Sequence, residues 1–412
     1  AMRDVSKALG LTPPQESKFE IASLQWQLRH AFPENPSRQE GVQQPFITTP
    51  AILQISSEVI ADSDRLQINH ILIPASGEIR GWQTTVPAAA WKQSIKSFQQ
   101  RLSQQARLDG TAERLSSVLL EPVLPELRRL GVTTLLLSLD RGLQGIPFAA
   151  LPANGSPLIE QMALTITPSL MLTDLQAKPQ SSQTPKTVLA GASHFANGLM
   201  PLPMVVEELQ QVASLHPGAT VLIDRSFNTQ SLLDQITRKP ISILHLATHA
   251  EFTHDHDKQG IIYTPSGQIS LQDLGRMLRT NRDTSLSLLV LNACRTAVGD
   301  EDQELGIAGL ALQAGASSAL GNLWLVDDVV SAAFSVQFHR AIQQGLPSDQ
   351  ALRKTQQQFM TGKIKVQNDQ IVNGNGDVLI TGLSRADQAR LGPGLQHPYF
   401  WAGAILSGKP WP

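Results

Sequence analysis

The sequence has one cysteine among its 412 residues, little net charge and no long hydrophobic run. A single cysteine excludes an internal disulfide framework and every zinc or iron–sulfur site that needs several cysteines, and it favours a reducing, cytoplasmic compartment. No stretch approaches about 18 consecutive apolar residues, so we expect no membrane-spanning helix. The net charge of −2 predicts neither a nucleic-acid partner nor attraction to an anionic membrane.

Signals for a metal or a nucleotide cofactor are also weak. The phosphate-binding pattern G-x-x-x-x-G-K-[ST] does not occur, so a nucleotide hydrolase has no support. Four candidate metal ligands crowd one short segment, namely His254, Asp255, His256 and Asp257. Neighbouring residues on a loop rarely converge on one ion, and no distant ligand accompanies them. We therefore expect a solvated loop there, no metal and no cofactor.

What the chain does contain is enough apolar sequence, 41% of its residues, for more than one core. Residues 1–47 are polar and rich in glutamine and proline, and they form a lead-in segment. Strand and helix patterns fill residues 48–174, and the polar segment 175–187 is a predicted linker. Residues 188–412 form the second domain, with a β-hairpin insertion near 361–380 that turns at Asn373-Gly374 or at Asn375-Gly376.

From residue 188 onward, apolar strand patterns alternate with amphipathic helical patterns of about 10 to 20 residues. This alternation predicts βαβ units and a mostly parallel sheet covered by helices on both faces. In such a sheet the carboxyl ends of the strands lie along one edge, where ligands bind. Three predicted strands end in residues with reactive or charged groups: His249, Cys294, and Asp327 with Asp328.

His249 and Cys294 are therefore expected to be neighbours at that edge. A cysteine needs an adjacent base to form a thiolate near neutral pH, and an imidazole can serve as that base and later protonate a leaving amine. The main-chain N–H groups of Cys294 and Ala250 could stabilise an oxyanion. The alternative is that Cys294 is an inert buried residue and His249 a structural one. The residues alone leave both readings open.

Two long blocks carry a family resemblance: ILHLATHAEF, and LVLNACRTAVGDEDQELGIAGLALQAGASSALGNLWLVDD. Together with LLLSLDRGLQGIPFAALP, PSGEIRGW and HPYFWAG, they resemble the CHAT domain, a caspase-like family that is frequent in bacteria and often accompanies TPR repeats. The resemblance covers about residues 50–408. It implies a caspase-like three-layer α/β/α sandwich with a mostly parallel sheet. It further implies a packed N-terminal α/β companion subdomain that resembles an inactive protease.

The resemblance also implies roles for particular residues. CHAT domains belong with caspases, separases and gingipains among the clan CD cysteine peptidases, so His249 is similar to their catalytic histidine and Cys294 to their nucleophile. The caspase signature Q-A-C-[RQG]-G compares with N-A-C-R-T here. Asn292 thus replaces the caspase glutamine as a candidate S1 residue, and the caspase preference for aspartate need not transfer. Ala250 stands where caspases have glycine, which alters one oxyanion donor.

The stretch GNLWLVDD resembles the part of separases whose acidic residues accept a basic P1 side chain. Asp328, or Asp327, could form a charge-assisted contact with a substrate arginine. The alternative is that either aspartate caps the following helix, since acids favour helix N-termini. The two roles do not exclude each other.

These inferences predict a cytoplasmic cysteine endopeptidase of the CHAT type that hydrolyses a protein or peptide substrate after Arg or Lys. A TPR or other regulatory region is the expected partner, whereas no nucleic acid or membrane is expected. The competing prediction is a catalytically silent, caspase-like scaffold or protein-interaction module.

Overall fold

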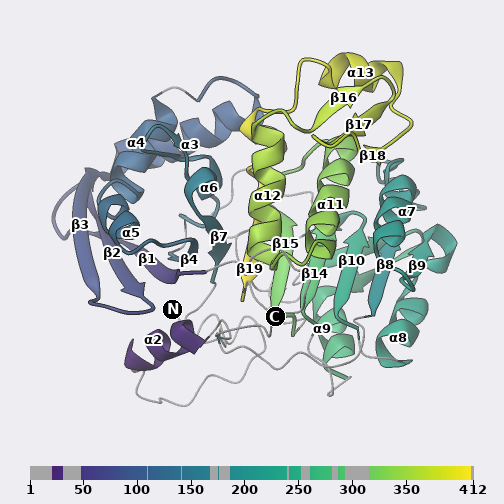
Figure 1. Cartoon of the computed structure of the whole chain (residues 1–412), viewed down its shortest axis with the longest axis horizontal. Coiled ribbons are helices and arrows are strands. Elements are labelled where there is room, and N and C mark those ends of the chain that lie inside the picture. Colours follow the sequence, from purple (N-terminus) through teal and green to yellow (C-terminus); the bar gives the residue numbers. More distant parts are fainter. Residues whose placement is uncertain are drawn as a thin grey trace. The chain divides into compact units, whose positions relative to one another are not determined.

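The structure is a computed structural model that describes residues 21–30, 48–108, 110–140, 142–167, 175, 186–238, 241–251, 260–280, 286–292 and 315–409. The chain divides into two compact units, one of Ala1–Gln180 with Trp411–Pro412 and one of Ser181–Pro410. Figure 1 shows the elements of both units. The predicted boundaries at residues 47, 174 and 187 stay a prediction.

The N-terminal unit contains a mixed sheet. Its described strands, in spatial order, are β3 (Arg80–Pro87), β2 (Arg65–Pro74), β1 (Pro50–Val59), β4 (Thr134–Leu139) and β7 (Ala163–Ile166). The first three pair antiparallel, and β1, β4 and β7 pair parallel. Gly77 turns the β2–β3 hairpin with a φ of +101°, a conformation that glycine adopts without steric cost.

Helices and short strands complete this unit. They are α2 (Ile21–His30), α3 (Ala88–Ser103), α4 (Thr111–Leu119), α5 (Leu124–Arg129), α6 (Leu158–Gln161), β5 (Pro152–Ala153) and β6 (Ser156–Pro157). Leu24 and Leu28 of α2 pack against Ile52, Ile73 and Leu136 of the sheet. The apolar stripe of α2 is thus buried on strands that are far away in the sequence.

The C-terminal unit holds the predicted mostly parallel sheet. Its described strands, in spatial order, are β19 (Ala404–Gly408), β15 (Ser318–Asn322), β14 (Leu288–Asn292), β10 (Ile243–Ala247), β8 (Thr187–Gly191) and β9 (Thr220–Ile223). The strands from β15 to β9 pair parallel, and β19 is antiparallel to β15. The predicted α/β class is confirmed.

Helices cover both faces of this sheet. They are α7 (Val205–Leu215), α8 (Thr229–Arg238), α9 (Leu271–Thr280), α11 (Asp328–Gln343) and α12 (Ser348–Met360), with α13 (Arg385–Leu391) further along the chain. Successive side chains of a strand point to opposite faces. Accordingly Leu244 and Leu246 pack with residues of α8 and α9, whereas His245 between them contacts His339 of α11. Figure 1 shows α7, α11 and α12 across that second face.

Two small sheets complete the C-terminal unit: β11 (Ala250–Glu251), β12 (Ile261–Thr264) and β13 (Gly267–Ser270), and β16 (Lys365–Gln367), β17 (Gln370–Val372) and β18 (Val378–Ile380). The second lies where the sequence predicts one hairpin, and it is a three-stranded antiparallel meander. The unpredicted turn is at Asn368, whose φ is +58°. Among the described residues, no helix is long and apolar enough to cross a membrane.

The end of β8 contacts its neighbours so closely that only glycine fits. A Cβ added to Gly191 would lie 2.5 Å from the carbonyl oxygen of Ala247 and 2.7 Å from a methyl of Val205. We therefore expect Gly191→Ala to lower the free energy of unfolding by about 1–3 kcal/mol, measured by urea denaturation. Gly267→Ala is the matched control, because its added Cβ would lie 3.4 Å from its nearest neighbour. Equal stability of the two variants would contradict this account of the packing.

Candidate active site

His249 follows β10 directly, at the carboxyl edge of the sheet. Main-chain hydrogen bonds fix the chain on both sides of its ring: the N–H of Thr248 donates to Asn292 (3.3 Å), and the N–H of Tyr263 donates to the carbonyl of His249 (2.9 Å). The ring of Phe195 packs against the half-buried imidazole, with 4.8 Å between ring centroids. The histidine thus projects from a segment that main-chain hydrogen bonds and a ring contact hold in place.

The imidazole of His249 has one defined tautomer. Its Nε2 lies 2.8 Å from the carbonyl oxygen of Met200, and a carbonyl can only accept, so Nε2 carries the proton. In the neutral ring Nδ1 then bears the lone pair and can act as a base. Sequence reasoning did not find Met200, because a backbone carbonyl leaves no signature in the residue type.

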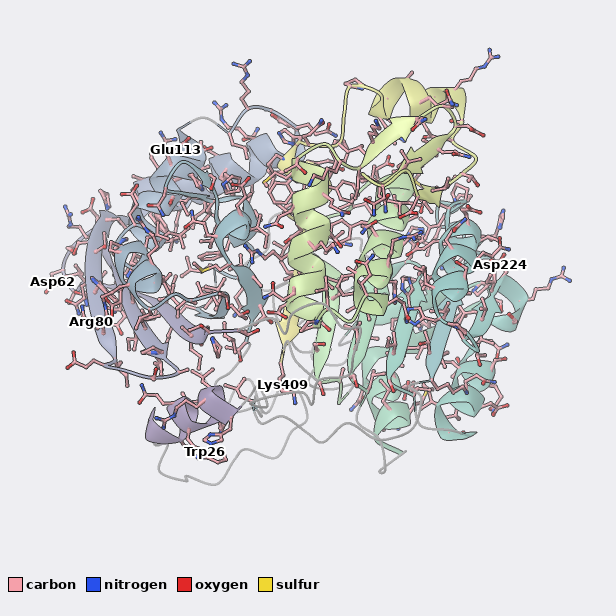
Figure 2. The ribbon with its side chains drawn as sticks, viewed as in Figure 1. Trp26, Asp62, Arg80, Glu113, Asp224 and Lys409 are labelled. Atoms are coloured by element: carbon pink, nitrogen blue, oxygen red, sulfur yellow. The ribbon has the colours of Figure 1, made fainter. Side chains whose placement is uncertain are left out.

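The loop that carries Phe195 is tied to the neighbouring strand. Main-chain N–H and side-chain Oγ of Ser193, just beyond β8, donate to the carboxylate of Asp224 at 2.7 and 2.8 Å. Asp224, labelled in Figure 2, directly follows β9 and has a φ of +48°. Such a conformation persists in a residue other than glycine only where its surroundings hold it. The ends of β8 and β9 are therefore fixed together beside His249.

Cys294 lies outside the described residues, which end on this strand at Asn292. The strand register still relates it to His249. Ala247 of β10 pairs directly with Asn292 of β14, and His249 and Cys294 each follow a member of that pair by two residues. Neighbouring strands of a sheet are about 4.8 Å apart. The register agrees with the expectation that the two residues are neighbours, and the dyad itself stays a prediction.

Ala250 begins β11 and pairs with Ile262 of β12. Its methyl group is fully buried in the core under the sheet, so the fold accommodates alanine where caspases have glycine. Its N–H group as an oxyanion donor stays a prediction.

The side-chain amide of Asn292 forms hydrogen bonds with a buried carboxylate. Its Nδ2 donates to both carboxylate oxygens of Glu208, at 2.9 and 2.8 Å, and Glu208 is 1% exposed. The amide that the sequence offers as a candidate for substrate binding thus contacts a buried acid of α7. Its role in the S1 site stays a prediction.

Asp327 caps α11, as the alternative reading of the sequence proposes. Its Oδ1 accepts from the N–H groups of Val329 (3.1 Å) and Val330 (3.2 Å), and its Oδ2 pairs with Arg390. Capping satisfies two of the helix N–H groups that lack intrahelical partners.

Asp328 links α11 to the segment that holds His249. Its Oδ2 accepts from the N–H of Met204 at 3.0 Å, four residues after the carbonyl of Met200. Burial raises the pKa of Asp328 to about 6, opposed by the hydrogen bond from Met204 and reinforced by the nearby charge of Glu208. The carboxyl of Asp328 therefore changes its charge near pH 6.

A small cavity lies at the carboxyl ends of β14 and β15. It measures about 20 Å³, which is room for roughly one water molecule. Polar groups on its wall come from Asn292, Asn322, Ser331 and Ser335.

No group of described residues brings together three histidine, cysteine or acidic side chains that could hold a metal ion. The four candidate ligands at residues 254–257 lie outside the described part of the chain. The expected solvated loop stays a prediction.

The sheet, its helices and the histidine at its carboxyl edge define a caspase-like α/β protein. The family model of the CHAT domain matches residues 109–409, which is more than half of the chain. The chain belongs to the CHAT domain family. The sequence resemblance begins at about residue 50, whereas the family model matches only from residue 109. The segment PSGEIRGW therefore lies outside the match.

Solved structures share this fold. Two crystal structures of the Saccharomyces cerevisiae separase–securin complex match with TM-scores of 0.53 and 0.51, each at 9% identity over 94% of this chain and 31% of that chain. The Arg-specific cysteine proteinase gingipain R matches with a TM-score of 0.45 at 9% identity, over 78% of this chain and 76% of that one. At an identity this low, the two separase structures show the fold alone. Comparison with curated protein sequences gives no match.

Proposed function

We propose that this chain is a cysteine endopeptidase in which His249 and Cys294 form the catalytic dyad and which cleaves a protein substrate after Arg or Lys. The observation that carries the proposal is the hydrogen bond from His249 Nε2 to the carbonyl of Met200 (2.8 Å). This bond leaves Nδ1 as the basic nitrogen of the ring. The ring follows the end of β10, which pairs in register with β14, the strand that precedes Cys294.

In the proposed reaction, His249 Nδ1 takes the proton of the Cys294 thiol, and the thiolate attacks the scissile carbonyl. The carbonyl of Met200 stabilises the imidazolium that forms, because it accepts from Nε2–H. The N–H groups of Cys294 and Ala250 receive the developing oxyanion. The imidazolium then protonates the leaving amine, and water activated by the same histidine hydrolyses the acyl-enzyme.

A basic P1 side chain would pair with an acid at the start of α11. Asp328 is the better of the two candidates, because Arg390 already neutralises Asp327. Since the pKa of Asp328 is raised to about 6, the acid is charged above pH 6. We therefore propose that KM for arginyl substrates rises as pH falls below 6.

The Asp328→Asn variant tests this assignment. Asparagine keeps an oxygen that can accept from Met204 but removes the charge. We expect KM for an arginyl peptide to rise about 10- to 100-fold, the equivalent of one lost charge-assisted hydrogen bond, while the melting temperature changes little. A peptide with an uncharged citrulline at P1 is the matched substrate, and Asp327→Asn is the matched variant. The same arginine-to-citrulline preference in Asp328→Asn and the parent would exclude Asp328 from P1 recognition.

The second candidate function is a catalytically silent, caspase-like module that binds another protein. The hydrogen bonds that groups of the protein itself form with Asn292, Asp327 and Asp328 favour it. Under either function we propose a TPR or other sensor region as regulatory partner, and a cytoplasmic setting that keeps Cys294 reduced. Comparison of peptide cleavage by the parent and by Cys294→Ala separates the two functions.

A further inference from the structure

Three buried histidines form a line of hydrogen-bonded rings between the sheet and its covering helices. His245 of β10 and His339 of α11 are both fully buried, and His216, at the end of α7, is 6% exposed. The Nδ1 of His245 lies 2.9 Å from Nε2 of His339, and Nδ1 of His339 lies 2.9 Å from Nε2 of His216. Sequence reasoning left all three residues unassigned.

The partners at the outer end of the line set the direction of every hydrogen bond. The side-chain nitrogen of Gln343, which can only donate, lies 2.8 Å from Nδ1 of His216. His216 must then carry its proton on Nε2 and donate to His339, and His339 must donate from Nε2 to His245. In this arrangement the rings of His216 and His339 are neutral. Burial lowers the pKa of His216 to about 4 and that of His339 further below its usual value, in agreement with neutral rings.

The inner end of the line is Glu208. Nε2 of His245 lies 3.0 Å from Glu208 Oε1, although its N–H does not point along a regular hydrogen bond, so the contact is chiefly electrostatic. Asn292 of β14 donates to both carboxylate oxygens of Glu208, and Asp328 of α11 interacts with the same acid through its charge. Glu208 is therefore surrounded by donors on the strand side and needs both of its oxygens as acceptors.

These contacts end two residues before the candidate nucleophile. Asn292 is the last residue of β14, and the chain continues through Ala293 to Cys294. A buried charged acceptor that holds a side chain with two hydrogen bonds restricts it far more than water does. We propose that Glu208 is a positioning residue: its carboxylate, supported by the three histidines, holds Asn292 and thereby directs the chain that presents Cys294 to His249. This inference rests on the proposed dyad.

The preceding residue of α7 provides a matched control. Glu207 is half-buried and accepts from Thr381 Oγ1 (2.9 Å) and from Gln211 (3.0 Å), so it has the same charge and helix but no contact with Asn292. In Glu208→Gln, an amide nitrogen replaces one of the two acceptor oxygens and would face a donor. In Glu207→Gln, the same chemical change occurs away from the cysteine strand.

Alkylation of the single cysteine by iodoacetamide reports its thiolate directly and needs no substrate. The experiment measures the alkylation rate against pH in the full chain and in its His249→Ala, Glu208→Gln and Glu207→Gln variants. We expect a midpoint below the usual thiol value of about 8.5 in the parent and an upward move in His249→Ala. We expect Glu208→Gln to move the midpoint upward by at least about half a unit and to lower kcat about tenfold or more. Glu207→Gln should match the parent.

Each outcome decides one of the two claims. If His249→Ala keeps the parent's midpoint, the proposed dyad fails, and the role of Glu208 fails with it. If His249→Ala moves the midpoint but Glu208→Gln does not, or if Glu207→Gln moves it equally, the role of Glu208 is overturned and the dyad stands. Should Glu208→Gln not fold, Asn292→Ala breaks the same contact from the strand. A parent-like profile in that variant overturns the inference as well.

Discussion

Replacement of Cys294 by alanine is expected to abolish cleavage of arginyl peptides while the protein keeps its fold. The thiol is the nucleophile of the proposed reaction, and no other cysteine exists in the chain to replace it. Loss of a nucleophile typically lowers kcat by about 10⁴-fold or more. Initial rates with a fluorogenic arginyl peptide measure the effect, and circular dichroism with thermal melting checks the fold.

The control for this variant is Ser287→Ala. Ser287 immediately precedes β14, so it lies at the opposite end of the strand from the carboxyl edge. Its turnover should equal that of the parent. Cleavage by Cys294→Ala at the parent's rate would remove the proposed dyad. Absence of cleavage by parent and variant alike, under conditions in which the protein is folded, would favour the silent module.

Acidification is expected to destabilise the protein below pH 6.5, through the buried histidines. Burial lowers the pKa of His216 to about 4 and lowers that of His339 well below 6.5. The unfolded chain therefore binds protons that the folded chain does not, and stability falls as pH falls through 6.5 toward 4. At pH 5 the titration of His216 lowers the unfolding free energy by about 2 kcal/mol relative to pH 7, and that of His339 lowers it further.

The titration of Asp328 has the opposite effect on stability: acidification raises its contribution to the unfolding free energy. Its pKa is raised to about 6 in the fold, so its contribution to stability is complete below its unfolded pKa and is lost as pH rises through 6. Between pH 7 and pH 5 the titration of Asp328 raises the unfolding free energy by about 1 kcal/mol. This gain is smaller than the loss that the two histidines cause. Urea denaturation at pH 7 and pH 5 should therefore show a lower unfolding free energy at pH 5.

His339→Gln tests the cause of this effect. Glutamine can donate toward His245 and accept from His216 as the imidazole does, but it does not titrate. We expect the unfolding free energy of the variant to fall less than that of the parent between pH 7 and pH 5. The same loss in both proteins would show that His339 does not bind a proton on unfolding in this range.

Much of the fold could be predicted from the sequence, because each strand and helix follows its own periodic pattern. The alternation of apolar runs and amphipathic stretches after residue 188 predicts the parallel sheet, and right-handed connections place the strand ends on one edge. His249 therefore appears at the carboxyl edge as expected. The register of β10 and β14, which aligns Ala247 with Asn292, could not be predicted because it depends on how the two strands slide past each other.

The contacts of the site were much less predictable. The carbonyl of Met200 orients His249 without any signature in the sequence, since every residue has a carbonyl. Glu208 did leave a signal: it stands between Val205 and Leu209 on the buried face of α7, where an acid needs a partner. His245 left a similar signal within an apolar strand. Only tertiary packing shows that these two residues meet.

The roles of Asp327 and Asp328 at the start of α11 could not be predicted from their position in the sequence. Their place after β15 agrees with both helix capping and substrate binding. The structure assigns capping to Asp327 and a backbone contact to Asp328, because helix N-termini and loop N–H groups compete with a substrate for the same carboxylates.

The measurement that tests the central claim most directly is the digestion of an unbiased peptide library by the parent protein and by Cys294→Ala, with identification of every new terminus. We predict that the parent cuts after arginine and lysine and that the variant produces no cuts above background. Cuts by the parent after uncharged or acidic residues would contradict the basic P1 preference. The same cuts in both digests would contradict a cysteine endopeptidase.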